Sequence, residues 1–585
     1  MTNSTKAPGA EIPIVHYKTD VLIVGGGAAG TMAAFECADA GVHVTQVTKG
    51  RATSGTTTVA RGGFAAAMGK DDSPKFHLQD ILKYGGELID PELARVWVYD
   101  IVDVVHDLEA WGADFVRRPD GELDLKMFPS HSRPRAVHNY DFTGNMLTKV
   151  LSKKLRADAR IDKHSITAIM DLIRRDGRVV GAWGVDYRNG TLVSYSAQQT
   201  ILCTGGGSGL FYVNDNPPQV TGDGYVLGFR AGVPLLGIEM IDFQAMCCSP
   251  PELFGFAPHP TGFINAGAVF RNQEGEEFLK RYFPETAEAS TRSEVILAMA
   301  QEIHAGRATS TGGIFMDATK VPLEVIQKMI PYVYKTCLHQ GIDITKVPLE
   351  VAPGSHTWLG GLKIDVDGKT PVDGLFAAGE TAGGIHGGNR IGGSALSSSL
   401  VFGRRAGRKA AELVKGAGVD LQSAAYEIPN SERAWLAELM HRDQGPLQAD
   451  VRTSCRMLAH HKLGPIRDDK TLREALREFE RIETEDAHEM RLADKARTSD
   501  HERGNELESA LSVRNLALLG RILATAALRR TESRGAHFRL DFPDTDDVHW
   551  RVVTRLESGD AGAIEFHTDP AKEPANAGEL TPNDE

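Results

Sequence analysis

A glycine-rich turn near the N-terminus offers the first candidate for chemistry. Residues 25–30 read Gly-Gly-Gly-Ala-Ala-Gly, which places glycines at the Gly-x-Gly-x-x-Gly spacing. An apolar run at 20–24 comes directly before this turn, and an alanine-rich segment at 31–40 follows it. This spacing between a buried strand and a helix is typical of dinucleotide binding, and a chance glycine turn is the alternative.

Each glycine of this spacing is expected to have its own structural role. Gly25 would permit the tight turn, Gly27 would let the backbone approach a pyrophosphate, and Gly30 would let the helix pack closely on the strand. The free N–H groups at the start of the helix, at Ala28 and Ala29, favour a negatively charged group. The sequence therefore predicts that a pyrophosphate rests on this helix N-terminus.

The second expected strand, 43–48, ends where a dinucleotide-binding unit usually carries an acidic residue. Thr48 and Lys49 hold that place. Thr48 could still meet a ribose hydroxyl. Because the carboxylate is missing, NAD is a less favoured cofactor than FAD, whose adenosine other loops can hold.

Further glycine clusters lie far apart in the sequence, at 54–63, 204–207, 221–224 and 374–393. Glycine lets the backbone pass close to a flat ring or a phosphate, and a helix expected at 394–407 presents a second N-terminus to the cofactor. Separated segments that converge on one dinucleotide indicate a two-part flavin fold, and a flexible surface loop is the alternative for the cluster at 54–63. The cofactor-binding candidates in these segments are Thr56, Thr57, Gly62, Gly63, Thr204, Gly205, Asp223, Glu380, Ser394 and Leu396.

The composition excludes several classes of protein. The 585 residues carry 65 Lys and Arg against 78 Asp and Glu, a net charge of −13, so nucleic acid is not an expected partner. Apolar runs such as 201–203 are far shorter than a membrane span, and the polar segment 1–20 lacks the build of a secretory signal. Six cysteines without a Cys-x-x-Cys pair argue against a disulfide scaffold and a self-contained iron–sulfur cluster or zinc ribbon, and they indicate a reducing compartment.

The positions of the clusters also predict the order of the domains. A stretch at about 240–355 lacks the glycine pattern, so we expect an inserted domain there. After about 425 the chain is highly charged, with helices expected at 432–442, 471–493 and 507–531. The expected units are an N-terminal extension (1–17), a cofactor domain in two parts (18–240 and 356–425), a capping or substrate domain (241–355), a helical domain (426–566) and a disordered tail (567–585).

A set of short motifs occurs together in this chain. They are Gly25–Gly30, Ala60–Gly63, Thr221–Gly224, His356–Gly361, Gly379–Glu380, His386–Gly393 and Glu532–His537. With these motifs, the chain from about 20 to 550 resembles the flavoprotein subunits of succinate dehydrogenase and fumarate reductase, a family that also includes L-aspartate oxidase. The resemblance implies an α/β fold with a Rossmann-like FAD-binding domain, an inserted α+β capping domain, a C-terminal helical domain and FAD as the cofactor. Lys49 fits as well, because the family commonly places Ser-Lys there.

The resemblance also implies a reaction and the residues that carry it. FAD N5 would exchange a hydride with one carbon of an activated C=C bond, as in the interconversion of fumarate and succinate, while Arg292 transfers the proton at the neighbouring carbon. His356 would bind the substrate, and the planar fork of Arg390 would clamp a substrate carboxylate. The structural alternatives are a salt bridge at a helix start for Arg292 and a satisfied structural histidine for His356.

Two departures from the family pattern change these expectations. Many members carry a histidine in the second glycine loop that bonds covalently to FAD, whereas residues 55–58 contain none, so we expect non-covalent FAD. Met246 stands where a substrate-binding histidine would fall, and His259 lies about 13 residues later. We expect either His259 to enter through an altered loop or the second carboxylate site to be rebuilt. Cys247 and Cys248 are interpreted as buried small residues, with a redox thiol as the sharper alternative.

Competing functions follow from these departures. The leading hypothesis is a catalytic subunit of the fumarate reductase or succinate dehydrogenase type. The alternatives are the same fold acting on another unsaturated carboxylic acid, an L-aspartate-oxidase-like enzyme, and a non-catalytic FAD-binding subunit. Because the chain lacks cluster-binding cysteines, the expected electron partner is an iron–sulfur subunit, with a free-standing reductase as the other option. The expected location is the cytoplasm, with peripheral attachment to the cytoplasmic face of the inner membrane through other subunits as the variant.

Overall fold

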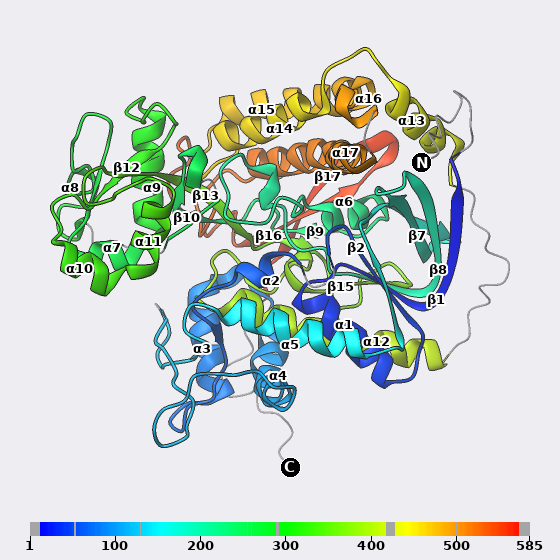
Figure 1. Ribbon diagram of the computed structural model, residues 1–585, viewed down its shortest axis with the longest axis horizontal. Coiled ribbons are helices and arrows are strands. Elements are labelled where there is room, and N and C mark those ends of the chain that lie inside the picture. Colours follow the sequence, from blue (N-terminus) through cyan, green and yellow to red (C-terminus); the bar gives the residue numbers. More distant parts are fainter. Residues whose placement is uncertain are drawn as a thin grey trace.

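The computed structural model (Figure 1) describes residues 12–572. Within that span it leaves out 52–53, 129, 254, 259, 288–289, 291, 417–427 and 498–499.

A seven-stranded sheet forms the centre of the molecule. Its order is β5-β2-β1-β8-β7-β6, with β15 also pairing with β8. Strands β5, β2, β1, β8 and β15 run parallel, while β7 is antiparallel to both β8 and β6. Residues 21–23 of β1 are fully buried, which explains the unbroken apolar run in the sequence. The bounds are β1 Ile14–Val24, β2 Val44–Thr48, β5 Ile161–Ser165, β6 Thr167–Arg175, β7 Arg178–Asp186, β8 Thr191–Leu202 and β15 Leu375–Ala377.

Helix α1 (Ala28–Asp39) packs tightly against helix α12 (Ser394–Gly416) beside this sheet (Figure 1). Two glycines of α12 make the close approach possible. A Cβ on Gly403 would lie 2.2 Å from the carbonyl oxygen of Ala29, and a Cβ on Gly407 would lie 2.5 Å from that of Ala33. The N-termini of both helices, from separate parts of the chain, are thereby fixed relative to each other.

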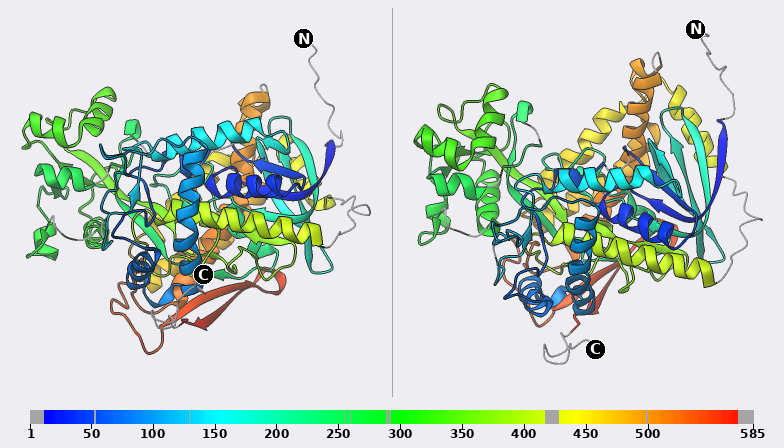
Figure 2. Two further views of the ribbon diagram at one scale, coloured as in Figure 1. Left: turned by 90° about the horizontal axis from the view of Figure 1, so that it is seen from below. Right: turned by 60° about the horizontal axis from the view of Figure 1, so that its bottom comes forward.

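The inserted segment forms a second, smaller sheet in the order β10-β13-β12-β11, antiparallel throughout. In both views of Figure 2 this capping domain (green) lies at the end of the molecule away from strand β1 (blue). The expected domain boundary at 355–356 falls inside β13, so His356 belongs to a strand of the capping sheet. The elements are β10 Ile241–Cys248, β11 Val269–Arg271, β12 Ile314–Asp317, β13 Leu349–Trp358, α7 Pro260–Ala266, α8 Leu279–Tyr282, α9 Arg292–His304, α10 Leu323–Met329 and α11 Pro331–His339.

The C-terminal region combines helices with a β-hairpin. Strands β16 (Val552–Ser558) and β17 (Ile564–Pro570) pair with each other, and β16 extends a small sheet with β9 (Leu235–Leu236) and β14 (Gly361–Leu362). The C-terminal helical domain therefore also contributes a hairpin to this small sheet. The helices are α13 Asn430–His441, α14 Gln448–Lys462, α15 Asp469–Arg481, α16 Ala487–Glu489 and α17 Asp500–Arg529.

Three predicted boundaries are corrected by these elements. Strand β1 begins at Ile14 and pairs with β8 from there, so 14–17 belong to the sheet and not to an extension. Strand β17 runs to Pro570, so the tail does not begin at 567. The helix expected over 471–493 ends as a regular α-helix at Arg481 and continues through a π-helical turn into α16. Residues 1–11 and 573–585 lie outside the described residues.

Helix α17 is the central element of the C-terminal region. Its segment Glu502–Arg529 is long and apolar enough to cross a membrane by length and composition, but 78% of the apolar window is buried inside the protein. It packs against α14, α15, α6 (Asp223–Arg230) and β6. Such burial is the mark of a core helix.

Candidate cofactor and active site

The turn between β1 and α1 is built so that two of its glycines cannot be replaced. Gly25 has φ +123°, and a Cβ there would lie 2.0 Å from the carbonyl oxygen of Cys203. A Cβ on Gly30 would lie 2.1 Å from the carbonyl oxygen of Gly25. Backbone collisions therefore require glycine at both positions, whatever binds at the turn.

Gly27 has a different environment. Its φ of −74° suits any residue, and the nearest protein atom to an added Cβ is Thr57 Oγ1 at 3.5 Å, an ordinary contact. No side chain caps α1 at Gly27, and its first turn holds no acidic residue. The Ala28 N–H donates to Thr57 Oγ1 at 3.0 Å, and both residues line a cavity at the helix N-terminus that suits the phosphates of FAD.

A cavity opens in front of this helix N-terminus, between the two parts of the cofactor domain. Most of the predicted cofactor-binding residues line it: Gly25, Gly27, Ala28, Ala29, Thr48, Lys49, Thr56, Thr57, Thr204, Gly205, Asp223 and Glu380. The donor groups are hydroxyls, backbone N–H groups and one lysine, and two carboxyls are present as acceptors. This set suits a dinucleotide with a pyrophosphate and two sugar chains.

The other candidates lie outside the cavity lining. Gly30 sits behind the turn, and a Cβ on Gly63 would lie 2.5 Å from the carbonyl oxygen of Val137. Ser394 begins α12, and its buried Oγ has no hydrogen-bond partner among the described residues. Gly62, Gly63, Ser394 and Leu396 remain proposals for contacts with the flavin end of the cofactor.

Sequence reasoning missed several lining residues. They are Gly50, Ser54, Thr167, Ile169, Gln219, Val220, Leu227 and Ser399. Thr167 and Ile169 come from β6, which gives no glycine signal, and Ser399 lies one turn inside α12. Their neighbours in the sequence could have indicated Gly50 beside Lys49, Ser54 at the start of the cluster 54–63, and Gln219 and Val220 directly before the motif at 221–224.

Lys49 and Asp223 form an ion pair at one end of the cavity. Lys49 Nζ lies 2.8 Å from Asp223 Oδ2 and also donates to Thr221 Oγ1 at 2.6 Å. Burial would raise the pKa of Asp223, but the charge of Lys49 and the hydrogen bonds to the carboxylate lower it overall. Asp223 is thereby held as an anion that can accept hydrogen bonds from hydroxyl groups.

His356 lies near the end of β13 and contacts two residues of the loop that precedes α6. Its Nδ1 lies 2.8 Å from Asp215 Oδ2, and its carbonyl oxygen accepts from Asn216 Nδ2 at 2.9 Å. Asn216 Oδ1 in turn accepts from Thr56 Oγ1 at 2.7 Å. A continuous set of hydrogen bonds therefore joins the second glycine loop to the histidine.

Arg390 is almost fully buried and already has a carboxylate partner. Its Nη2 lies 2.9 Å from Asp242 Oδ2, with both side chains less than a tenth exposed. Arg390 Nε is buried without a hydrogen-bond partner among the described residues. Burial, followed by the charge of Arg390, lowers the pKa of His386 to about 3. His386 is therefore neutral, and Arg390 is the cation of this loop.

Glu380 lines the cavity, and the charges of His356 and Arg390 both act on its ionisation. Its Oε1 accepts from the backbone N–H of Trp358 at 2.8 Å, and its carboxyl group lies against Gly206. Burial raises its pKa to about 7, although the Trp358 N–H and the charges of His356 and Arg390 act in the opposite direction. The expected acceptor for a sugar hydroxyl is thus a carboxyl group that changes its charge near neutrality.

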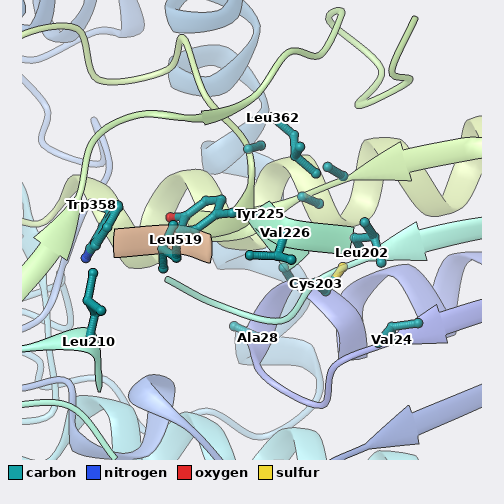
Figure 3. Packing of buried hydrophobic residues seen from close by; sticks show 14 of the residues in the cluster. Val24, Ala28, Leu202, Cys203, Leu210, Tyr225, Val226, Trp358, Leu362 and Leu519 are labelled. Carbon is teal, nitrogen blue, oxygen red and sulfur yellow. The ribbon is translucent and has the colours of Figure 1, made fainter. Parts of the chain in front are cut away.

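The wall behind Glu380 is apolar and closely packed. The rings of Trp358 and Tyr225 stack with their centroids 5.6 Å apart. Figure 3 shows Leu519 of α17 beside them, and Tyr225 also donates to the carbonyl oxygen of Glu380 at 2.6 Å. This packing holds the end of β13 against the cofactor domain.

The position at which a substrate-binding histidine was expected lies in a buried, apolar strand. Met246, Cys247 and Cys248 of β10 are all fully buried. Burial raises the pKa of both cysteine thiols well above the usual value, so neither is a reactive thiolate. A Cβ on Gly354 would lie 2.3 Å from Cys247 Sγ, so small residues are needed where these two positions meet.

Two predicted or candidate residues cannot be placed by their side chains. Arg292 begins α9, which packs against β10 and β13, but its side chain is outside the described part of the chain. His259 also lies outside the described residues. The structure describes the side chains of His356 and Arg390, neither of which is among the residues that line the cavity, and it places only the backbone of Arg292.

The fold and the cavity define a dinucleotide-binding oxidoreductase with a capping domain. A family model described as "FAD binding domain" matches residues 20–396, and one described as "Fumarate reductase flavoprotein C-term" matches residues 452–582. The chain belongs to the family of succinate dehydrogenase and fumarate reductase flavoprotein subunits, which are FAD-dependent oxidoreductases.

Curated relatives and solved structures agree with this assignment. The chain is 35% identical to a fumarate reductase (CoM/CoB) subunit from Methanothermobacter marburgensis over 90% of its own length and 95% of the relative's. It is 29% identical to L-aspartate oxidase from Pseudomonas aeruginosa, covering 90% and 96% of the two chains. The structure of Mycobacterium smegmatis Sdh1 in complex with UQ1 superimposes with a TM-score of 0.86 at 31% identity, covering 96% of this chain and 95% of the other.

Proposed function

We propose that the protein interconverts fumarate and succinate. The observation that carries this proposal is the hydrogen bond at 2.8 Å between Glu380, which lines the cavity, and the Trp358 N–H of β13, the strand that also carries His356. The charges of His356 and Arg390 both act on the ionisation of this carboxyl group. A carboxylic acid held by these two groups would lie next to the cofactor. The relatives named fumarate reductase support the same substrate class.

The residues of this chain would divide the work in a simple way. FAD, when bound, supplies the acceptor or donor of two electrons. His356 and Arg390 would hold the substrate carboxylates and stabilise the negative charge that develops on them. Arg292, at the start of α9, would transfer the proton at the carbon that does not exchange a hydride. We propose non-covalent FAD because the segment 55–58 contains no histidine.

The test uses the purified holoprotein, reduced under anaerobic conditions. Fumarate is added, and the return of the visible absorbance of oxidised flavin is followed by stopped flow. Fast reoxidation that is lost in Arg292→Ala, with FAD retained, supports the proposal. Fast reoxidation that is unchanged in Arg292→Ala overturns the role of this arginine, whereas a lack of reoxidation by fumarate and by every other acid favours a non-catalytic electron-transfer subunit.

A second candidate function follows from Met246. Its fully buried side chain stands where a substrate-binding histidine was expected, so the far side of the substrate site is apolar. This favours another unsaturated carboxylic acid over fumarate, and an activity like that of L-aspartate oxidase is the further alternative. Silence with fumarate and reoxidation by another acid from a panel would select this candidate.

We also propose that the partner is an iron–sulfur electron-transfer subunit. All six cysteines are free and buried, so this chain offers no cysteine cluster to carry electrons away from the flavin. A complex of this kind would hold the protein in the cytoplasm, at the cytoplasmic face of the inner membrane. Co-purification of an iron-containing protein with the tagged full-length chain tests the pairing.

A further inference from the structure

Asp215 makes a contact with His356 that no motif in the sequence indicated. The two side chains come from positions 141 residues apart, and they meet at 2.8 Å. The Asp215 side chain is only 13% exposed, whereas that of His356 is 29% exposed. The carboxylate is therefore the inner partner, and the imidazole ring is the one that solvent or substrate can reach.

The backbone around Asp215 is tied directly to β13. Ser355 donates its N–H to the carbonyl oxygen of Val213 at 3.1 Å, and Asp215 donates its N–H to the carbonyl oxygen of Ser355 at 3.4 Å. Asn214 and Ser355 form a parallel bridge. The loop thus runs alongside the strand, and the carboxylate is held next to the ring by its own main chain.

Building on the proposed function, we propose that Asp215 is a positioning residue that sets the orientation and the tautomer of His356. An ionised carboxylate only accepts hydrogen bonds, so the contact places a proton on Nδ1. Nε2 is then left for the substrate, and it donates to a carboxylate when the ring carries its second proton.

The other charged groups near the ring do not replace Asp215. Arg390 is engaged by Asp242 at 2.9 Å. Glu380 hydrogen-bonds to the backbone N–H of Trp358, and its charge varies near neutrality because its pKa is about 7. Within the part of the chain that the structure describes, the carboxylate that contacts the imidazole of His356 is that of Asp215.

A first test reads the ring itself and does not depend on turnover. Protein labelled with 15N-histidine is studied by NMR, and the signal of His356 is assigned by its loss in His356→Gln. In the wild type we expect a protonated Nδ1, and in Asp215→Ala we expect the ring to lose this preference. An identical His356 signal in both proteins would overturn the inference, even if fumarate proves to be the substrate.

A second test separates binding from chemistry on whichever acid the wild-type enzyme turns over. Asp215→Asn should raise KM roughly tenfold and change kcat by less than about threefold, because the lost interaction is made with the bound anion. In the background of His356→Gln, the same substitution should add little, since Asp215 acts through the histidine. Full additivity of the two substitutions would mean that Asp215 acts elsewhere.

A matched control exists in the cofactor domain. Asp162 of the edge strand β5 contacts His43 Nε2 at 2.9 Å, but this pair is about half exposed, and His43 directly precedes the neighbouring strand β2. Asp162→Asn removes the same kind of contact and should leave KM unchanged. If this control and Asp215→Asn change KM equally, the effect is not specific to the site and the inference fails.

Discussion

Glu380 is a buried carboxyl group whose charge changes with pH near neutrality. Burial raises its pKa from the ordinary value of 4.5 to about 7, so the folded protein binds this proton more tightly than the unfolded chain does. The stability of the FAD-free protein should therefore fall as the pH rises from about 4.5 to about 7, and then become level, with a total effect of about 3 kcal/mol.

Glu380→Gln should remove this contribution. Thermal unfolding of the FAD-free wild type and variant at about pH 5 and about pH 8 measures it, because groups common to both proteins cancel in the difference. We expect the variant to gain on the wild type as the pH rises. Parallel pH profiles would show that Glu380 is ionised throughout this range.

The N-terminus of α1 gives a prediction at the scale of an element. Gly27→Ala adds a Cβ whose nearest protein atom is 3.5 Å away, so the FAD-free protein should keep its stability to within about 0.5 kcal/mol. The same methyl group would enter the space reserved for the pyrophosphate, so FAD affinity should fall at least about tenfold. Flavin fluorescence titration and thermal unfolding measure the two effects.

Gly41→Ala is the matched control for this prediction. Gly41 has φ +79° with no atom within 4 Å of an added Cβ, so alanine there strains the backbone by about 1 kcal/mol without touching the cavity. The control should lose stability and keep FAD, the reverse of Gly27→Ala. Equal FAD affinity in the wild type and Gly27→Ala would argue against a pyrophosphate at this turn.

Local signals explain which elements could be predicted from the sequence. The strand, turn and helix at 20–40 were predictable because the apolar run, the glycine spacing and the alanine-rich segment are adjacent. The hairpin of β16 and β17 is local, but its pairing with β9 is not predictable from a local pattern, because β9 lies more than 300 residues earlier. For the same reason, no local pattern could bring Asp215 to His356 or Asp242 to Arg390.

At the scale of the whole molecule, Arg61 links the cofactor domain to the cap. Its guanidinium carbon lies 5.3 Å from the ring centroids of both Phe256 and Tyr332, which belong to the capping domain. Each exposed cation–π contact contributes about 0.5–1 kcal/mol. Arg61→Ala should therefore loosen the cap, and hydrogen exchange should increase about threefold or more in α11 but not in the central sheet.

Arg133→Ala serves as the comparison for the cap prediction. Arg133 lies 4.3 Å from the ring of Phe76, so it makes the same kind of contact within the cofactor domain alone. Its loss should leave exchange in α11 unchanged. If Arg61→Ala also leaves α11 unchanged, the cap is held by other contacts and Arg61 has no role in closing it.

The burial of α17 has a consequence for how the protein is made. This helix has the length and apolar composition of a membrane span, yet its faces are covered by α14, α15, α6 and β6. Two of these partners, β6 and α6, leave the ribosome some 270 residues or more before α17 does. A cofactor domain that folds during synthesis therefore provides a docking surface before the apolar helix appears. A variant that delays the folding of this domain would expose α17 to membranes and chaperones during synthesis.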